Sequence, residues 1–229
     1  MIRALFGLLV VLAGCSAGTT GPQLTATLTA PTDITLTWRP TDPAAAGQIV
    51  EYTNEAGSPY TILAFVPPDL ATYRHPDLIP QTPFYYRIRP YYGTASTPVN
   101  VTLPPGDVDQ STSDNGDWAR PATIPGGPPA VAGVRDPRSA PTALTPTIVN
   151  PNGIHFTWTD NSTDEEGFFL EVRTPGETLF RVAAVLDPNV TSFGLTTLES
   201  EKQAAYQVRP IRYGPPTNVA HQTTGGQSG

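Results

Sequence analysis

The chain has 229 residues, with 27 Pro, 20 Gly and one Cys, and a formal net charge of −7. A single cysteine excludes an internal disulfide framework, the acidic balance argues against a nucleic-acid partner, and the abundant proline argues against long helices. The apolar share of 38% still allows a buried core. With proline and glycine as turn residues, this composition favours an all-β fold.

The N-terminus has the composition of a secretory signal. Arg3 precedes ten apolar or small residues, 4–13, and the single cysteine, Cys15, follows closely. Ten residues are too few to cross the hydrocarbon core of a bilayer, which takes about 20, so a transmembrane anchor is disfavoured. Two alternatives remain: a signal cut directly before Cys15, and an ordinary signal cut a few residues later, for instance after Ala17.

The sequence Leu12-Ala13-Gly14-Cys15 resembles the lipobox of bacterial lipoproteins. The resemblance implies that residues 1–14 are a lipoprotein signal peptide, that the Cys15 thiol carries a diacylglyceryl group, and that residues 15–20 form a lipidated spacer. It also implies a lipid-anchored location in the bacterial cell envelope. Because Ser16 rather than Asp follows the cysteine, the resemblance favours the outer membrane or the cell surface.

Two segments of the chain repeat one another at an offset of 120 residues. Residues 24–90 and 144–210 share 15 identities in 67 positions without a gap, and the identities fall at Trp, Glu, Tyr and turn residues. Such a repeat indicates two homologous structural units rather than one domain.

The repeat also predicts where the units begin and end. We expect domains at 21–103 and 140–224, with a Pro/Gly-rich linker at 104–139 between them and a disordered tail at 225–229. Proline-rich chain is semi-extended, and a short polar tail lacks a core to hold it.

Within each repeat, apolar and polar residues alternate with a period of two, as they do in half-buried strands. Residues 34–38 and 84–88 alternate in this way in the first repeat, and residues 154–158 and 168–172 do so in the second. Helical periodicity is nowhere sustained. Runs of this kind, separated by Pro, Gly, Asp and Asn, predict antiparallel β-sandwiches.

Both repeats resemble fibronectin type III domains. The resemblance rests on the Trp that closes the second strand, on the Glu-bearing third strand, and on the run Leu78-Ile79-Pro80-Gln81-Thr82 before the sixth strand. It implies two immunoglobulin-like antiparallel β-sandwiches. The residues that it implies are structural are Trp38, Trp158, Tyr86 and Tyr206.

The chain departs from this family at one position in each repeat. The corner tyrosine of the family stands six residues after that leucine, where this chain has Phe84 and Ala204. Neither side chain carries a hydroxyl. The departure implies that packing alone holds this corner in both domains.

Charged and aromatic residues gather on the predicted sixth strand. Glu51 and Glu171 on the third strand are expected to pair, at the surface, with arginines of the neighbouring sixth strand, Arg87, Arg89 and Arg209. A partly exposed binding patch is a second expectation. Its residues are Tyr85, Arg87, Tyr91, Tyr92 and Tyr213. The alternative is that these aromatic side chains shield the sheet edge and the core.

The remaining candidates are weaker. Asp160, Ser162 and Asp164 alternate in an acidic loop, but they lack the Gly and Glu that complete a calcium-binding EF-hand loop. A zinc site would need histidines from both repeats to converge, and the three are His75, His155 and His221. The sequence has neither a nucleophile elbow nor a glycine-rich phosphate loop. We therefore expect no cofactor and no enzymatic activity.

Together these features predict a non-catalytic, lipid-anchored cell-envelope protein that acts as a spacer, adhesion or protein-binding module. Its expected partners are the membrane, through the lipid at Cys15, and a protein or polysaccharide that the sequence does not identify. A carbohydrate-binding or accessory subunit at the envelope is the alternative function.

Overall fold

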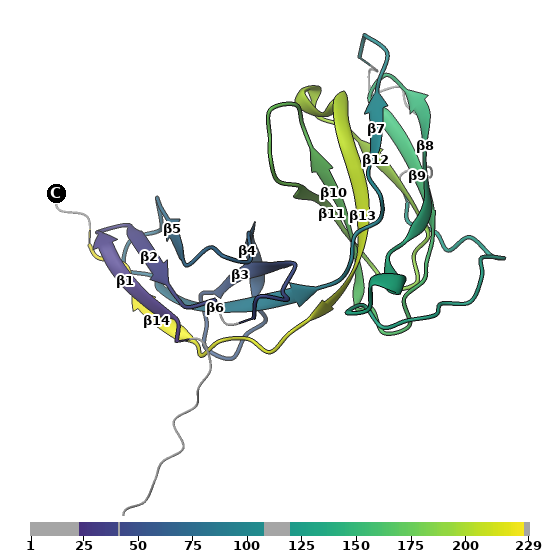
Figure 1. The fold of residues 1–229 in the computed structure, drawn as a ribbon. Coiled ribbons are helices and arrows are strands. Elements are labelled where there is room, and N and C mark those ends of the chain that lie inside the picture. The colour runs from purple at the N-terminus through teal and green to yellow at the C-terminus, as the bar shows by residue number, and fades with distance from the viewer. Residues whose placement is uncertain (1–22, 41, 108–119, 227–229) are drawn as a thin grey trace, which may run out of the picture.

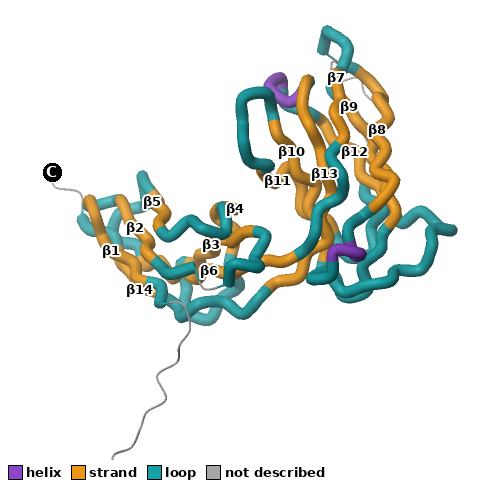
Figure 2. Tube along the Cα trace, viewed as in Figure 1, coloured by secondary structure: helices purple, strands orange, loops and turns teal. Residues whose placement is uncertain are grey.

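The computed structural model describes residues 23–40, 42–107 and 120–226, and within them β-strands predominate (Figures 1 and 2). The first repeat contributes β1 (Thr25–Ala30), β2 (Asp33–Thr37), β3 (Gly47–Thr53), β4 (Thr61–Val66), β5 (Thr72–His75), β6 (Pro83–Tyr92) and β7 (Val99–Thr102). The second contributes β8 (Thr142–Asn150), β9 (Gly153–Thr159), β10 (Gly167–Arg173), β11 (Arg181–Leu186), β12 (Ser192–Thr196), β13 (Gln203–Tyr213) and β14 (Ala220–Thr223). The described residues also include the 3₁₀ turns η2 (Pro137–Ser139) and η3 (Glu199–Glu201).

The strands form two antiparallel sandwiches. In the first, the sheet β1-β2-β5 faces strands β4, β3, β6 and β14, and in the second the sheet β12-β9-β8 faces strands β11, β10, β13 and β7. Each sandwich encloses its own apolar core. The predicted fold class, two fibronectin type III-like sandwiches, is confirmed.

Each core contains a tryptophan at the end of the second strand: Trp38 directly follows β2, and Trp158 lies in β9. The Trp38 indole donates a hydrogen bond to the Gln48 side chain at 2.7 Å, and the Gln48 amide in turn donates to backbone carbonyls of the loop after β4. In the second repeat Phe168 stands at the position of Gln48, and the buried Trp158 indole nitrogen has no hydrogen-bond partner among the described residues. The two cores therefore share their packing but not their polar contacts.

A tyrosine hydroxyl ties down one of the two corners. The Tyr206 hydroxyl donates to the backbone carbonyl of Glu201, five residues earlier, at 2.9 Å. The expectation that packing alone holds both corners is thus wrong for the second sandwich, where the corner tyrosine stands two positions after Ala204. Its counterpart Tyr86 contacts the His75 ring nitrogen Nδ1 at 2.9 Å instead.

The seventh strand of each repeat belongs to the other sandwich. β14 pairs with β6, so the end of the chain completes the first sandwich, and β7 pairs with β13, so the first repeat completes the second sandwich. Figure 1 shows yellow β14 lying beside purple β1, and teal β7 among the green strands. The predicted boundaries follow the repeat, 21–103 and 140–224, whereas the sandwiches divide the chain differently because they exchange these strands.

The chain crosses between the sandwiches where a hairpin turn would otherwise stand. β6 is followed by Gly93, which has a φ of +147°, and a Cβ there would lie 1.7 Å from the Pro210 carbonyl oxygen. β13 is followed by Gly214-Pro215-Pro216, and consecutive prolines favour extended chain over a tight turn. At the crossing, Tyr91 of β6 pairs with Tyr213 of β13, which makes one continuous eight-stranded sheet.

Part of the predicted linker lies against the second sandwich. Ala122 forms a β-bridge with Ser192, and Ala132 forms one with Ser162. Val134 is fully buried and packs with Ala45 and Tyr92 of the first sandwich. Residues 120–139 therefore help to join the two sandwiches and are not a free spacer.

The predicted disordered tail is ordered at its beginning. Gly225 donates a hydrogen bond to the Pro31 carbonyl at 2.8 Å and accepts one from the Gln81 backbone at 3.3 Å. The expectation of disorder is wrong for this residue, because β14 carries the chain end onto the first sandwich. Residues 227–229 lie outside the described residues.

Candidate binding cleft between the two sandwiches

The outward face of the long sheet carries a third apolar cluster, which lies between the sandwiches. Its buried members are Ile49 of β3, Tyr91 of β6, Phe169 of β10 and Ile211 of β13. The Phe169 ring lies 5.0 Å from the ring centroids of both Phe65 and Tyr91, in edge-to-face contact. These residues occupy the strand positions that would face solvent in an isolated sandwich, so each half covers the other.

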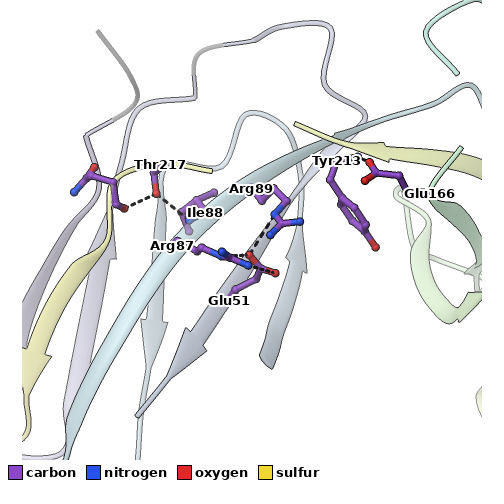
Figure 3. Close-up of polar contacts among 8 residues, drawn as sticks. Glu51, Arg87, Ile88, Arg89, Glu166, Tyr213 and Thr217 are labelled. Carbon is purple, nitrogen blue, oxygen red and sulfur yellow. Dashed lines mark hydrogen bonds and ion pairs between the residues drawn. The ribbon is translucent and has the colours of Figure 1, made fainter. Parts of the chain in front are cut away.

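In the first sandwich the predicted cross-strand ion pairs are present (Figure 3). Glu51 of β3 accepts from Arg87 Nε at 2.6 Å, and Arg89 Nε lies 3.5 Å from the same carboxylate. Only 7% of Glu51 is exposed. The expectation that this ion pair lies at the surface is therefore wrong for Glu51.

The second sandwich repeats this pairing at greater depth. Glu171 of β10 accepts two hydrogen bonds from Arg209 of β13, at 2.8 and 3.0 Å, and a third from the Gln207 amide at 2.5 Å. Glu171 is only 3% exposed. Arg209 also donates to the Gly93 carbonyl of the crossing segment at 2.8 Å. This ion pair thus joins the second sandwich to the chain that leaves the first.

A cavity of about 620 Å³ opens beside this ion pair, between the two halves. Its base is formed by Tyr91, Glu171, Gln207 and Arg209, all on the outward face of the long sheet. One side is formed by the end of β4 and the loop after it, residues 65–68, and the other by the β10–β11 hairpin, residues 176–182. The volume lies within the range of small-ligand sites, about 300–1,000 Å³.

Two polar groups at the base of the cavity lack partners within the described residues. The Gln207 amide nitrogen donates to Glu171, and the Gln207 carbonyl oxygen makes no hydrogen bond to a described residue, although the residue is only 6% exposed. The Tyr91 hydroxyl likewise makes no hydrogen bond to a described residue, and Tyr91 is also 6% exposed. Burial, followed by the nearby Glu171 charge, raises the pKa of Tyr91 to about 12, so the hydroxyl remains a donor at neutral pH.

The five residues of the predicted patch do not form one exposed surface. Tyr91 and Tyr92 are buried, so the expectation of partial exposure is wrong for both. Tyr91 lies in the cleft, whereas the Tyr92 hydroxyl donates to Asp42 at 2.7 Å and its ring lies 3.6 Å from the Arg135 guanidinium carbon. For Tyr92, the alternative interpretation, in which the aromatic ring shields the sheet and the core, fits the structure.

The other three are half-buried in separate places. The Tyr85 ring stacks on His221 of β14 with centroids 4.5 Å apart, and Arg87 lies over Tyr60 at 4.0 Å while it binds Glu51. Tyr213 receives Arg89 over its ring at 5.2 Å, and its backbone donates to Glu166 at 2.8 Å (Figure 3). The contacts of these three side chains therefore stabilise the packing of the protein itself.

The acidic loop directs its oxygens to protein donors. Asp160 accepts from the backbone and hydroxyl of Ser162, each at 2.9 Å, and burial raises its pKa. Asp164 accepts from the Val134 backbone at 2.7 Å and from Arg212 at 3.1 Å. Across the part of the chain that the structure describes, no three His, Cys, Asp or Glu side chains are grouped to hold a metal ion. This loop therefore fastens residues 132–134 to the second sandwich.

The predicted lipidation residue, Cys15, lies outside the described residues. Within residues 23–40, 42–107 and 120–226, no helix is long and apolar enough to cross a membrane.

Sequence reasoning missed the cavity because its walls come from both repeats. One signal was nevertheless available. Arg87 and Gln207 occupy equivalent positions, so the second repeat replaces a glutamate-binding arginine by an amide. Only the structure shows that this amide lines the same cavity as Tyr91 of the other repeat.

No protein-family model and no curated protein matches this sequence. Among solved structures, an Fn3-like protein from Clostridium thermocellum is 26% identical over 31% of this chain and 73% of its own, with a TM-score of 0.28. The FN1-FN3 domains of chicken CNTN1 are 14% identical over 90% of this chain and 66% of theirs (TM-score 0.29). A segment of chicken tenascin with two fibronectin type-III domains is 15% identical over 89% of this chain and 99% of its own, with a TM-score of 0.27. The sandwich assignment rests on the strand order of this chain itself.

Proposed function

We propose that this chain is a non-catalytic, lipid-anchored cell-envelope protein that acts as a binding or adhesion module, with the cleft between its sandwiches as the contact site. The observation that carries this proposal is the reciprocal exchange of β7 and β14. Sandwiches joined only by a flexible linker move relative to one another by default. Exchanged strands and the shared cluster around Phe169 oppose that motion and keep the walls of the cleft in register.

The anchor in this proposal is the thiol of Cys15, on the strength of the lipobox-like run before it. Burial of acyl chain contributes about 0.8 kcal/mol per methylene, so one chain holds weakly and two or three chains together hold almost permanently. Fully extended chain spans at most about 3.6 Å per residue. The first sandwich would therefore stay close to the membrane, since seven residues separate Cys15 from Gln23.

Replacement of the thiol tests the anchor. Cys15→Ser should move the full chain from the membrane fraction to the soluble fraction of a bacterial envelope preparation, because a hydroxyl cannot form the thioether. Thr19→Ala, four residues later, is the matched control and should leave the protein in the membrane fraction. If the Cys15→Ser protein remains with the membrane, the lipid anchor is refuted. Ser16→Asp should shift a Gram-negative protein from the outer to the inner membrane.

A carbohydrate-binding or accessory role at the envelope is the second candidate. It is favoured by the polar base of the cavity, where an amide and a hydroxyl lie beside an internally neutralised ion pair. A spacer role without a ligand would require neither group.

A further inference from the structure

The base of the cleft holds one acceptor and one donor in fixed orientations. The Glu171 carboxylate can only accept hydrogen bonds, so it orients the Gln207 NH₂ group toward itself. The Gln207 carbonyl oxygen is left as an acceptor without a partner among the described residues. Glu171 in turn accepts hydrogen bonds from Nε and Nη2 of Arg209. Tyr91, packed edge-to-face on Phe169, supplies the hydroxyl. Ligand hydroxyl groups would satisfy these two side chains, because a hydroxyl can donate to the Gln207 carbonyl and accept from the Tyr91 hydroxyl.

The charges around the cavity cancel. Its lining includes two acidic residues, Glu171 and Glu177, and two basic residues, Arg181 and Arg209. Glu171 pairs with Arg209 at 2.8 Å, and Arg181 lies 3.9 Å from Glu177 and 2.6 Å from Glu201. A buried charge that lacks a counter-ion is strongly disfavoured, so a cavity with internally paired charges selects a ligand without net charge.

The sides of the cavity carry several apolar residues beside Glu177, Thr178 and Arg181. The apolar residues are Phe65, Val66, Pro67, Pro68, Leu179, Phe180 and Val182. Because these residues stand beside the polar base, the cavity suits a molecule that carries hydroxyl groups on its edge and C–H groups on its face. A pyranose ring has this distribution of polar and apolar atoms.

An extended peptide fits this base less well. A peptide strand binds a sheet through unpaired backbone groups at an edge. β10 pairs with β11 and β13, and β13 pairs with β10 on one side and with β7 and β6 on the other, so the base consists of interior strands. The available polar atoms are side-chain atoms, which favours the saccharide.

We propose that the cleft binds one ring of a neutral saccharide, whose hydroxyl groups bond to the Gln207 carbonyl and the Tyr91 hydroxyl while the ring lies against the apolar side. This inference rests on one part of the proposed function, namely that the cleft is the contact site. It does not depend on the lipid anchor.

Binding of short neutral oligosaccharides tests the inference. The probe is a panel built from glucose, galactose, mannose or xylose, applied to the full chain carrying Cys15→Ser so that the protein is soluble. We expect at least one member of the panel to bind, and isothermal titration calorimetry measures its affinity. Tyr91→Phe should weaken that binding about five- to tenfold, because it removes one hydrogen bond and leaves the ring in place. Gln207→Met, which removes the acceptor and keeps the length of the side chain, should weaken it to a similar extent.

Tyr92→Phe is the matched control, since Tyr92 is the neighbouring tyrosine and its hydroxyl bonds to Asp42 outside the cavity. It should leave the affinity unchanged. The inference is overturned if no neutral oligosaccharide binds at millimolar concentration, or if binding survives both Tyr91→Phe and Gln207→Met. Binding of peptides or of charged saccharides alone would also overturn it. None of these results bears on membrane attachment, which the Cys15→Ser fractionation measures separately.

Discussion

The hydroxyl of Ser96 accepts a hydrogen bond from the backbone N–H of Val208 at 3.1 Å, although 112 positions separate the two residues. The Ser96 backbone N–H in turn donates a hydrogen bond to the Val208 carbonyl at 2.8 Å. The opposite crossing has the same arrangement, because Thr217 binds the N–H of Ile88 through its hydroxyl at 3.0 Å and the Ile88 carbonyl through its own N–H at 2.8 Å (Figure 3). Each crossing segment is thus fastened to the strand of the other repeat by a hydroxyl-bearing residue.

Ser96→Ala should lower the free energy of unfolding by about 1–3 kcal/mol, because it leaves the buried Val208 N–H without an acceptor. Urea denaturation measures the change as a lower midpoint. Thr97→Ala, at the exposed neighbouring position, should change the stability by less than about 0.5 kcal/mol. Equal effects of the two substitutions would show that the Ser96 hydroxyl has no special role at the crossing.

A protease site inserted between residues 108 and 119 should cut the chain without separating its halves. Each half supplies the last strand of the sandwich that the other half builds, so the association does not depend on the linker. The cut protein should elute from a sizing column as one species and should separate only in denaturant. Separation under native conditions would contradict the strand exchange.

Glu171→Ala should destabilise the protein by about 3–5 kcal/mol, because it leaves the Arg209 guanidinium buried without its counter-charge. Arg138→Ala removes an ion pair with Asp136 at the surface and should change the stability far less, because solvent screens exposed pairs. Chemical denaturation of both variants tests the contrast. A loss near 1 kcal/mol for Glu171→Ala would mean that the pair is well hydrated.

Tyr206→Phe should cost about 1–3 kcal/mol, because the buried Glu201 carbonyl loses its donor. Tyr91→Phe is the matched comparison, since its hydroxyl bonds to no described residue and its loss should change stability by no more than about 0.5 kcal/mol. Thermal melting of the two variants in parallel decides the point. A larger loss for Tyr91→Phe than for Tyr206→Phe would contradict the assignment of Tyr206 as the corner tyrosine.

The stability of the first sandwich should decrease as the pH falls from about 7 to about 5. Burial among Tyr52, Phe84 and Tyr86 lowers the pKa of His75 below its usual value of 6.5. The unfolded chain then binds a proton at a higher pH than the folded chain, so stability is complete above about pH 6.5 and is lost as the pH falls through the lower folded pKa. His75 Nδ1 also lies 2.9 Å from the Tyr86 hydroxyl, so a protonated ring could only donate at this contact.

His75→Phe provides the control for this pH dependence. The variant keeps an aromatic ring and removes the titrating group, so its urea midpoint should vary less between about pH 7 and pH 5 than that of the unchanged protein. An unaltered pH dependence would assign the effect to other groups.

Much of the architecture was predictable from single positions and local patterns. The offset between Trp38 and Trp158 predicted two copies of one unit, and the period-two alternation at Ile34, Leu36 and Trp38 predicted strands with one buried face. The pairing of Glu51 with Arg87 also followed from the repeat, because charges at equivalent positions of neighbouring strands meet across the sheet. Each of these inferences depends only on the pattern within one strand or on the pairing of two neighbouring strands.

The partner of the seventh strand was not predictable in this way. β7 and β14 occupy equivalent positions in the two repeats, so either could complete either sandwich with similar hydrogen bonds, and the sequence alone does not distinguish a hairpin from an exchange. The burial of Glu171, Tyr91 and Gln207 follows from that choice, because only the exchange brings the two outward sheet faces together.

By itself, then, the sequence of 229 residues with one cysteine and 27 prolines determined two disulfide-free sandwiches and a lipobox-like N-terminus. The tertiary structure alone decided that the halves interlock and that a cavity lies between them. The physical reason is that alternation and turn residues act over a few positions, whereas strand exchange is a contact between segments more than 100 residues apart, such as Ser96 and Val208.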